Sequence, residues 1–101
     1  MFVGVLECDV LVSPAEPVHS LKHKRAVIRP VIVKLRRLEV AVTEAGDPDR
    51  LARALIGVAT VSGSVDQVHR VLDTCERQVA GEVELQILST RRRIIGEQDE
   101  D

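Results

Sequence analysis

The residues of this sequence best suited to chemistry are cations clustered where a helix is expected to begin. The stretch "SLKHKR" places Lys22, Lys24 and Arg25 directly after Ser20, a residue type that caps helices. The positive end of a helix macrodipole disfavours each cation by roughly 0.3–1 kcal/mol before screening. Because such departures from local rules concentrate at functional sites, and because free N–H groups beside basic side chains bind anions, this helix start is a candidate anion site.

Helical spacing extends this candidate site along the rest of the helix. Lys22, Arg25 and Arg29 share a face at i, i+3 and i+7, and Arg36 continues it, which suits a phosphate backbone. Seven Lys/Arg residues and no acid lie in the segment 19–37, although the whole chain has a net charge of -2. A second interpretation stays open, in which this face is merely solvated or paired with acids of the same fold.

A second group of cations is the run Arg91 to Arg93. If this run is extended, alternation sends Arg92 to the face opposite Arg91 and Arg93. Arg91 and Arg93 then either extend a phosphate-binding surface or form a charged edge that discourages aggregation between strands. The sequence does not decide between these two roles.

Metal binding and catalysis are not expected. His19 and His23 are four residues apart, but His19 precedes the proposed cap and no third ligand lies near. Cys8 and Cys75 fall on expected core stripes, which predicts two free thiols rather than reactive ones. The sequence contains no glycine-rich phosphate loop and no nucleophile-elbow motif. We therefore expect no cofactor, no metal site and no enzyme activity.

The composition is that of one globular domain. The chain has 101 residues, 45% hydrophobic and 30% charged, and its single aromatic side chain is Phe2, so the core must be aliphatic. The N-terminus lacks the basic region and cleavage site of a signal peptide, and no apolar run is long enough to cross a bilayer. These features predict a cytoplasmic protein.

Hydrophobic periodicity predicts six elements. They are a strand over Phe2 to Val12, a helix from Ser20 to about Leu38, a strand over Glu39 to Gly46, a buried strand over Leu55 to Val61, a helix from Ser64 to Gly81 and a strand over Glu82 to Leu88. Pro30 should kink the first helix without ending it. In the last strand Val83, Leu85 and Ile87 are expected to point inward, and "STRRRII" either continues that strand or leaves it.

The order β-α-β-β-α-β predicts an α+β fold, the ferredoxin-like split βαβ sandwich. Its four-stranded antiparallel sheet carries two helices on one face. We expect the first and third strands to lie side by side at the centre, running parallel. Residues 1–95 form a single domain, and residues 96–101 form an acidic tail that we expect to be disordered.

The sheet face away from the helices is predicted to be acidic and free of aromatics. Four acids are expected there: Glu7, Asp9, Glu39 and Glu84. Such a face should repel single-stranded RNA and offers no stacking platform, so a nucleic acid would bind on the helix side. Alternatively, Glu7 and Asp9 pair with Arg53 on the neighbouring strand. Apolar residues of the same face could instead support a homodimer: Val3, Val5 and Leu11.

Nearly the whole chain resembles the YlxP-like family, small bacterial proteins of unknown function. The resemblance rests on "MFVGVLECDV", "SLKHKRAVIRPVIVKLRR", "VAVTEAG", "ALIGVATVS" and "STRRRIIG". It implies a ferredoxin-like fold and a bacterial cytoplasmic setting, with genes often lying among translation-initiation and ribosome-maturation factors. It implies no enzyme activity. The chain departs from the family pattern at Leu38 and Glu39 and in the loop "GDPD".

These observations lead to one main hypothesis and two alternatives. The main hypothesis is a non-enzymatic accessory factor of translation or ribosome maturation, which binds structured RNA or a ribosomal particle through its basic first helix. One alternative is a homo-oligomeric protein-interaction module with no nucleic-acid role. The other is a site for a small anionic ligand at the helix start after Ser20.

Overall fold

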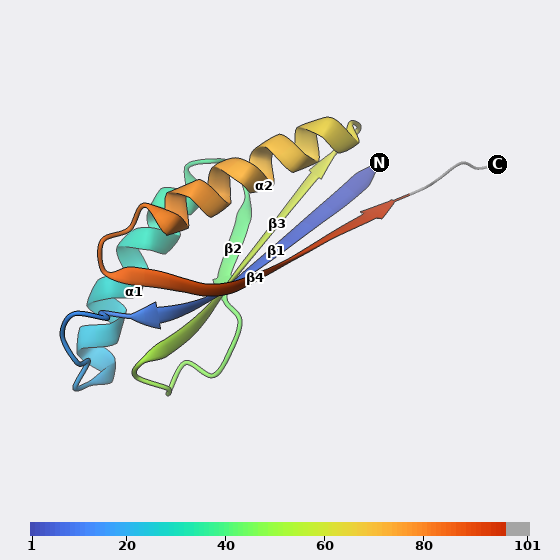
Figure 1. The fold of residues 1–101 in the computed structure, drawn as a ribbon. Helices are drawn as coiled ribbons and strands as arrows, with labels where there is room; N and C mark the ends of the chain where they lie inside the picture. Colours follow the sequence, from blue (N-terminus) through green and yellow to red (C-terminus); the bar gives the residue numbers. More distant parts are fainter. Residues whose placement is uncertain (97–101) are drawn as a thin grey trace.

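Two helices pack on one face of a four-stranded sheet, and the other face of the sheet is left uncovered (Figure 1). The computed structural model describes residues 1–96. Its elements are β1 (Phe2–Val12), α1 (Leu21–Arg36), β2 (Ala41–Glu44), β3 (Arg53–Ser62), α2 (Val65–Ala80) and β4 (Leu85–Gly96). The predicted order of elements, the antiparallel sheet and the two-layer arrangement are therefore confirmed.

The sheet order is β2-β3-β1-β4, with every neighbouring pair antiparallel. Strands β1 and β3 are central, as predicted, but the expectation that they run parallel was wrong, since Phe2 pairs with Ser62 and Leu11 with Arg53. The physical reason lies in the connections. The crossover through α1 makes β1 and β2 parallel, and β3 runs back between them after the turn that follows β2.

Alternation along β1 builds the core. Leu6, Cys8 and Val10 are fully buried under the helices, whereas the residues between them are half-exposed on the other face. Gly4 follows the same inward alternation, and a Cβ there would overlap the Val68 side chain of α2. The absence of a side chain at residue 4 therefore lets α2 approach β1 closely.

The first helix begins and continues as the sequence indicates. The Ser20 hydroxyl accepts a hydrogen bond from the backbone N–H of His23 at 3.1 Å, which is an N-cap. The helix passes through Pro30 as one element and ends at Arg36. Glu39 then turns the chain towards β2 with φ of 62°.

The last strand differs from its predicted bounds at both ends. It begins at Leu85 because residues 82–85 form a turn, in which the Leu85 N–H donates to the Glu82 carbonyl at 3.1 Å. Val83 lies in this turn and is 92% exposed, so its predicted inward position was wrong. The strand also continues through the arginine run to Gly96. The predicted acidic tail therefore loses Gly96 to the domain, and its other residues lie outside the described range.

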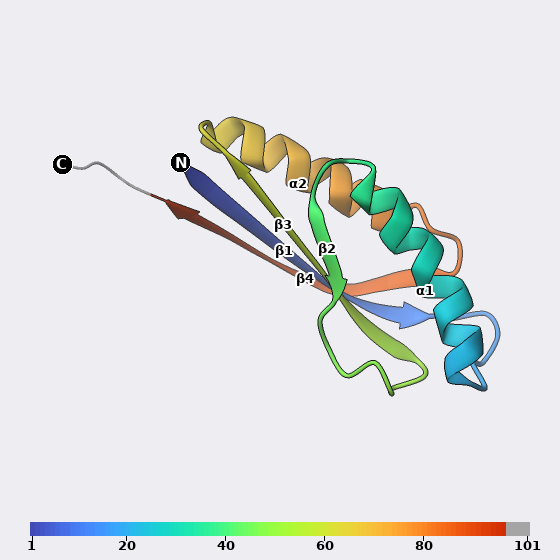
Figure 2. The same cartoon turned by 180° about the vertical axis from the view of Figure 1, so that it is seen from behind.

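The helices of residues 1–96 are too short or too polar to span a bilayer. Figure 2 shows the arrangement from behind, with α1 and α2 again on one side of the sheet.

Candidate nucleic-acid interface

The exposed face of α1 brings together three of the predicted cations. Lys22, Arg25 and Arg29 line one shallow hollow of about 400 Å³, together with Ala26 and Pro30. No acid of residues 1–96 lies within ion-pair distance of these three side chains. The hollow therefore has cationic walls and a small apolar floor.

Burial of the opposite stripe explains why these cations face solvent. The apolar side chains that α1 buries are Val27, Ile28, Val31 and Leu35. Helical geometry then turns the face that carries Lys22, Arg25 and Arg29 outward. Arg36 is also exposed, has no acidic partner in the described part of the chain, and continues this face one and a half to two turns beyond the hollow.

Lys24 does not belong to this exposed face. Its side chain is 2% exposed, its Nζ lies 2.8 Å from Glu44 Oε2, and it donates a hydrogen bond to the Pro48 carbonyl at 3.1 Å. The ion pair is a close charge contact without hydrogen-bond alignment, because Glu44 Oε2 has no hydrogen-bond partner. Lys24 therefore ties α1 to β2 and the loop after it, and the predicted phosphate contact by Lys24 is withdrawn.

The sequence contained a signal for this burial. Lys24 lies three and four residues before Val27 and Ile28, on the stripe that faces the sheet. Helical spacing alone could therefore have separated Lys24 from Lys22 and Arg25. Its partners could not have been identified in that way, because Glu44 and Pro48 come from another part of the chain.

The uncovered sheet face is not acidic. Arg91 donates to Glu7 at 3.0 Å, and Arg53 Nε donates to Asp9 Oδ1 at 3.2 Å. The alternative pairing of Asp9 with Arg53 is thus confirmed, whereas Glu7 pairs with Arg91 rather than Arg53. The expected acidic surface was wrong because strand register places an arginine opposite each of these acids.

The other two acids expected on this face lie outside the strands. Glu39 occupies the turn between α1 and β2. Glu84 precedes β4 and accepts a hydrogen bond from the Ser13 hydroxyl at 3.4 Å. The alternation assumed for both residues fails because their strands begin only after them.

The arginine run is divided between the two faces of β4, as alternation predicts. Arg92 turns to the helix side, where its guanidinium bonds Asp73 at 2.8 Å and Glu76 at 3.3 Å. Arg91 and Arg93 lie on the uncovered face, in register with Glu7 and Val5 of β1. The sheet thus separates Arg91 and Arg93 from the basic face of α1, so the predicted cations do not form one surface.

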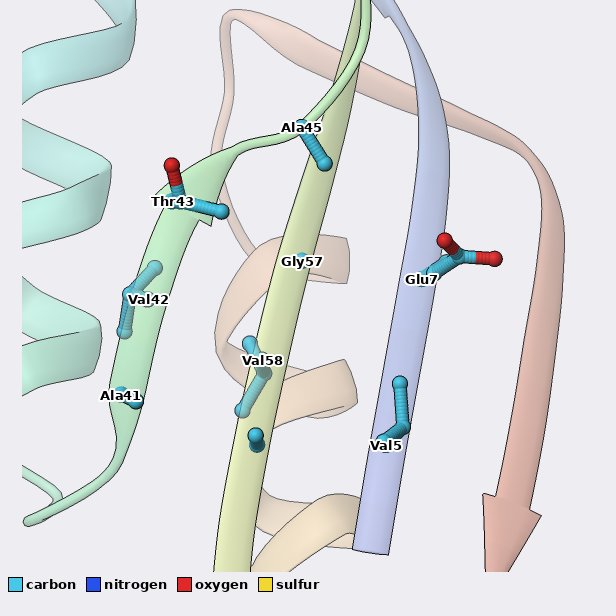
Figure 3. A pocket seen from close by; sticks show the side chains of 9 residues that line it. Val5, Glu7, Ala41, Val42, Thr43, Ala45, Gly57 and Val58 are labelled. Carbon is cyan, nitrogen blue, oxygen red and sulfur yellow. The ribbon is translucent and has the colours of Figure 1, made fainter.

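A second hollow lies on the uncovered face, over β3 (Figure 3). Its volume is about 300 Å³, and Gly57 leaves its centre without a side chain. Val5 and Glu7 border it on the β1 side, and Thr43 and Ala45 border it on the β2 side. The sequence gave no warning of this hollow, because its walls come from three strands.

The two cysteines are buried beneath α2. Burial, with a further contribution from Glu76, raises the pKa of the Cys8 thiol to about 11, and burial also raises the pKa of Cys75. Both residues are therefore neutral thiols at physiological pH. Within residues 1–96, no three His, Cys, Asp or Glu side chains are grouped so that they could hold a metal ion.

Comparison with known proteins agrees with this fold and leaves the activity open. Over its full length the chain is similar in structure to a de novo designed protein with a ferredoxin fold, solved by solution NMR, with a TM-score of 0.51, 9% identity and 91% of that chain covered. In sequence it is 32% identical over 71 residues to the uncharacterized protein YlxP of Bacillus subtilis (strain 168), which covers 69% of this chain and 74% of YlxP. Residues 3–92 match the model of the family described as protein of unknown function DUF503. The chain therefore belongs to the DUF503 family, as its resemblance to YlxP-like proteins indicates.

Proposed function

We propose that this protein is a non-enzymatic accessory factor that binds structured RNA, either free or within a ribosomal particle, through the exposed face of α1. The observation that carries the proposal is a contrast within one chain. Lys24, Lys34, Arg53, Arg91 and Arg92 each pair with an acid. The outward cations of α1, in contrast, have no acidic partner among residues 1–96. Their charge is therefore available to an external anion.

The geometry of α1 favours an extended polyanion over a single small anion. Lys22 and Arg36 are 14 residues apart, which corresponds to about 21 Å along a helix. The small side chains of Ala26 and Pro30 lie among the cations, so a backbone could approach the helix closely. The face contains no aromatic side chain for stacking bases. Recognition would therefore rest on phosphate positions and helical shape, which is how double-stranded RNA is usually bound.

The test is a pair of matched variants. Arg25→Gln/Arg29→Gln removes two charges from the proposed surface. Arg70→Gln/Arg77→Gln removes two charges from α2, where both arginines are exposed and contact only the neutral residues Gln67 and Thr74. Affinity for an RNA hairpin and for ribosomal subunits is measured across a salt gradient by fluorescence anisotropy and co-sedimentation.

We expect the slope of log K against log salt to change by about 1.5–2 for Arg25→Gln/Arg29→Gln, because each lost phosphate contact contributes roughly 0.7–0.9. The α2 control should keep the wild-type slope. Equal losses in the two variants would show that only net charge matters. Wild-type protein that binds neither RNA nor subunits at low salt would overturn the proposal. Lys24 is left unchanged, because replacing this buried residue would confuse a loss of binding with a loss of folding.

A further inference from the structure

We propose that the uncovered sheet face is a self-complementary interface, through which two copies of this chain form a two-fold dimer. The inference is independent of RNA binding. It starts from the register of the strands, which arranges this face in rows that cross the sheet. Three neighbouring rows, each read towards β4, are Val61, Val3 and Ile95; then Ala41, Ala59, Val5 and Arg93; then Thr43, Gly57, Glu7 and Arg91.

The first and third rows are complementary in shape. Val61 and Ile95 are 61% and 47% exposed, so the first row projects apolar side chains. Gly57 has no side chain, and the third row therefore contains the hollow of about 300 Å³ seen in Figure 3. A protruding row and a hollowed row thus lie on either side of the row that contains Ala59 and Val5.

A two-fold axis along the middle row brings these shapes together. Rotation about that row exchanges the first row with the third, which places Val61 of each copy over Gly57 of the other. The middle row meets itself, and Ala41 and Ala59 are small enough for two sheets to approach face to face. Because every contact is made twice, the arrangement is isologous and closes at two copies.

The charges of the face are compatible with this burial. Glu7 is already neutralised by Arg91 of its own chain, so the third row brings no unpaired acid into the interface. Arg91 and Arg93 lie on β4, the outer strand, and both are exposed. Their charged ends can therefore remain in water at the rim while their methylene groups pack.

A second copy fits this face better than an unrelated protein for one reason. The protruding side chains and the hollow that receives them occur on the same surface and are related by one symmetry axis. The helices lie on the opposite face. The dimer would therefore carry one basic α1 surface on each outer side, free to bind a ligand.

The first experiment measures mass by light scattering and sedimentation over a range of concentrations. The wild-type chain, of 11.1 kDa, should sediment at twice that mass. Val61→Glu should shift the protein towards monomer, because it places a charge in the hollow of the partner. Val83→Glu is the matched control, since Val83 is 92% exposed in the turn before β4, and it should remain dimeric.

The second experiment does not depend on a variant that folds. In a mixture of isotope-labelled and unlabelled wild-type protein, we expect filtered NOEs between the Val61 methyl groups and the methyl groups of Thr43 and Ala45. Within one chain Val61 lies four residues along β3 from Gly57, the partner of Thr43, which is about 13 Å and too far for such a signal.

A monomer at every concentration would overturn the proposal and leave this face to a different protein. A dimer without these NOEs, in which Val61→Glu behaves as Val83→Glu does, would also overturn it, because the interface would then lie elsewhere.

Discussion

Lys24 and Glu44 form a buried ion pair that joins α1 to β2, with Nζ and Oε2 2.8 Å apart. The pair lies directly below the exposed face that carries Lys22 and Arg25. One helix thus uses adjacent cations for opposite purposes, since the buried one secures the fold and the outward ones remain available to a ligand. The distinction decides which cations can be replaced in tests of binding and which can be replaced only in tests of stability.

Replacing Lys24 by Met should be strongly destabilising. Removing one partner of a buried pair leaves the other charge unpaired, which typically costs about 3–5 kcal/mol, and the 20% exposure of Glu44 favours the lower end of that range. Urea unfolding measures the change. Lys34→Met breaks an exposed pair with Glu82 and should cost less than about 1 kcal/mol. If Lys34→Met costs as much as Lys24→Met, burial is not what makes the Lys24 pair important.

The double variant Lys24→Met/Glu44→Leu should recover much of the stability lost in Lys24→Met, since no unpaired charge then remains buried. A double variant as unstable as the single one would show that the bond from Lys24 to the Pro48 carbonyl is the main contribution.

Replacing Gly4 by Ala should destabilise the protein by about 1–3 kcal/mol, the usual cost of adding a group to a packed core. The new Cβ would overlap the Val68 side chain on α2. Thermal unfolding should show a lower midpoint, and Gly4→Ala/Val68→Ala should relieve the overlap, although the smaller Val68 side chain itself loses packing. Gly63→Ala is the control, because nothing lies within 4 Å of a Cβ there. Equal effects at Gly4 and Gly63 would contradict the close approach of α2.

Replacing Glu39 by Gly should stabilise the turn after α1. Its φ of 62° lies in the left-handed region, which costs a residue with a Cβ roughly 1–2 kcal/mol. Part of that gain is lost to the greater chain entropy of glycine, so we expect a net gain of up to about 1 kcal/mol in unfolding free energy. Glu39→Ala keeps the Cβ and should give no gain. A gain of the same size in Glu39→Ala would point to the charge rather than to the backbone.

Burial of Cys8 should make stability fall at alkaline pH. Its pKa is raised from 9.0 to about 11, so the unfolded chain loses this proton at a lower pH than the folded one. The contribution of Cys8 is therefore fully present below pH 9 and is lost as pH rises towards 11. Urea unfolding of wild type and Cys8→Ala across that range measures it, and the variant should show a smaller decline. Parallel declines would contradict the assignment to Cys8.

Several features of this protein follow from the order of residues alone. Strict alternation in β1 and the spacing of Val27, Ile28, Val31 and Leu35 specify which face of each element is buried, because side-chain direction repeats with a fixed period in strands and helices. The Ser20 cap is likewise local. These periods were sufficient to predict the fold and to place Lys22, Arg25 and Arg29 on one surface.

The tertiary structure decided which charges meet. Glu7 faces Arg91 from 84 positions away, and Lys24 meets Glu44 from another layer. These pairs depend on strand order, on register and on where β2 and β4 begin, and a slip of one residue would turn each side chain to the other face. No local period contains that information. The sequence therefore indicated where the cations are, and only the packed sheet determined which of them are already neutralised.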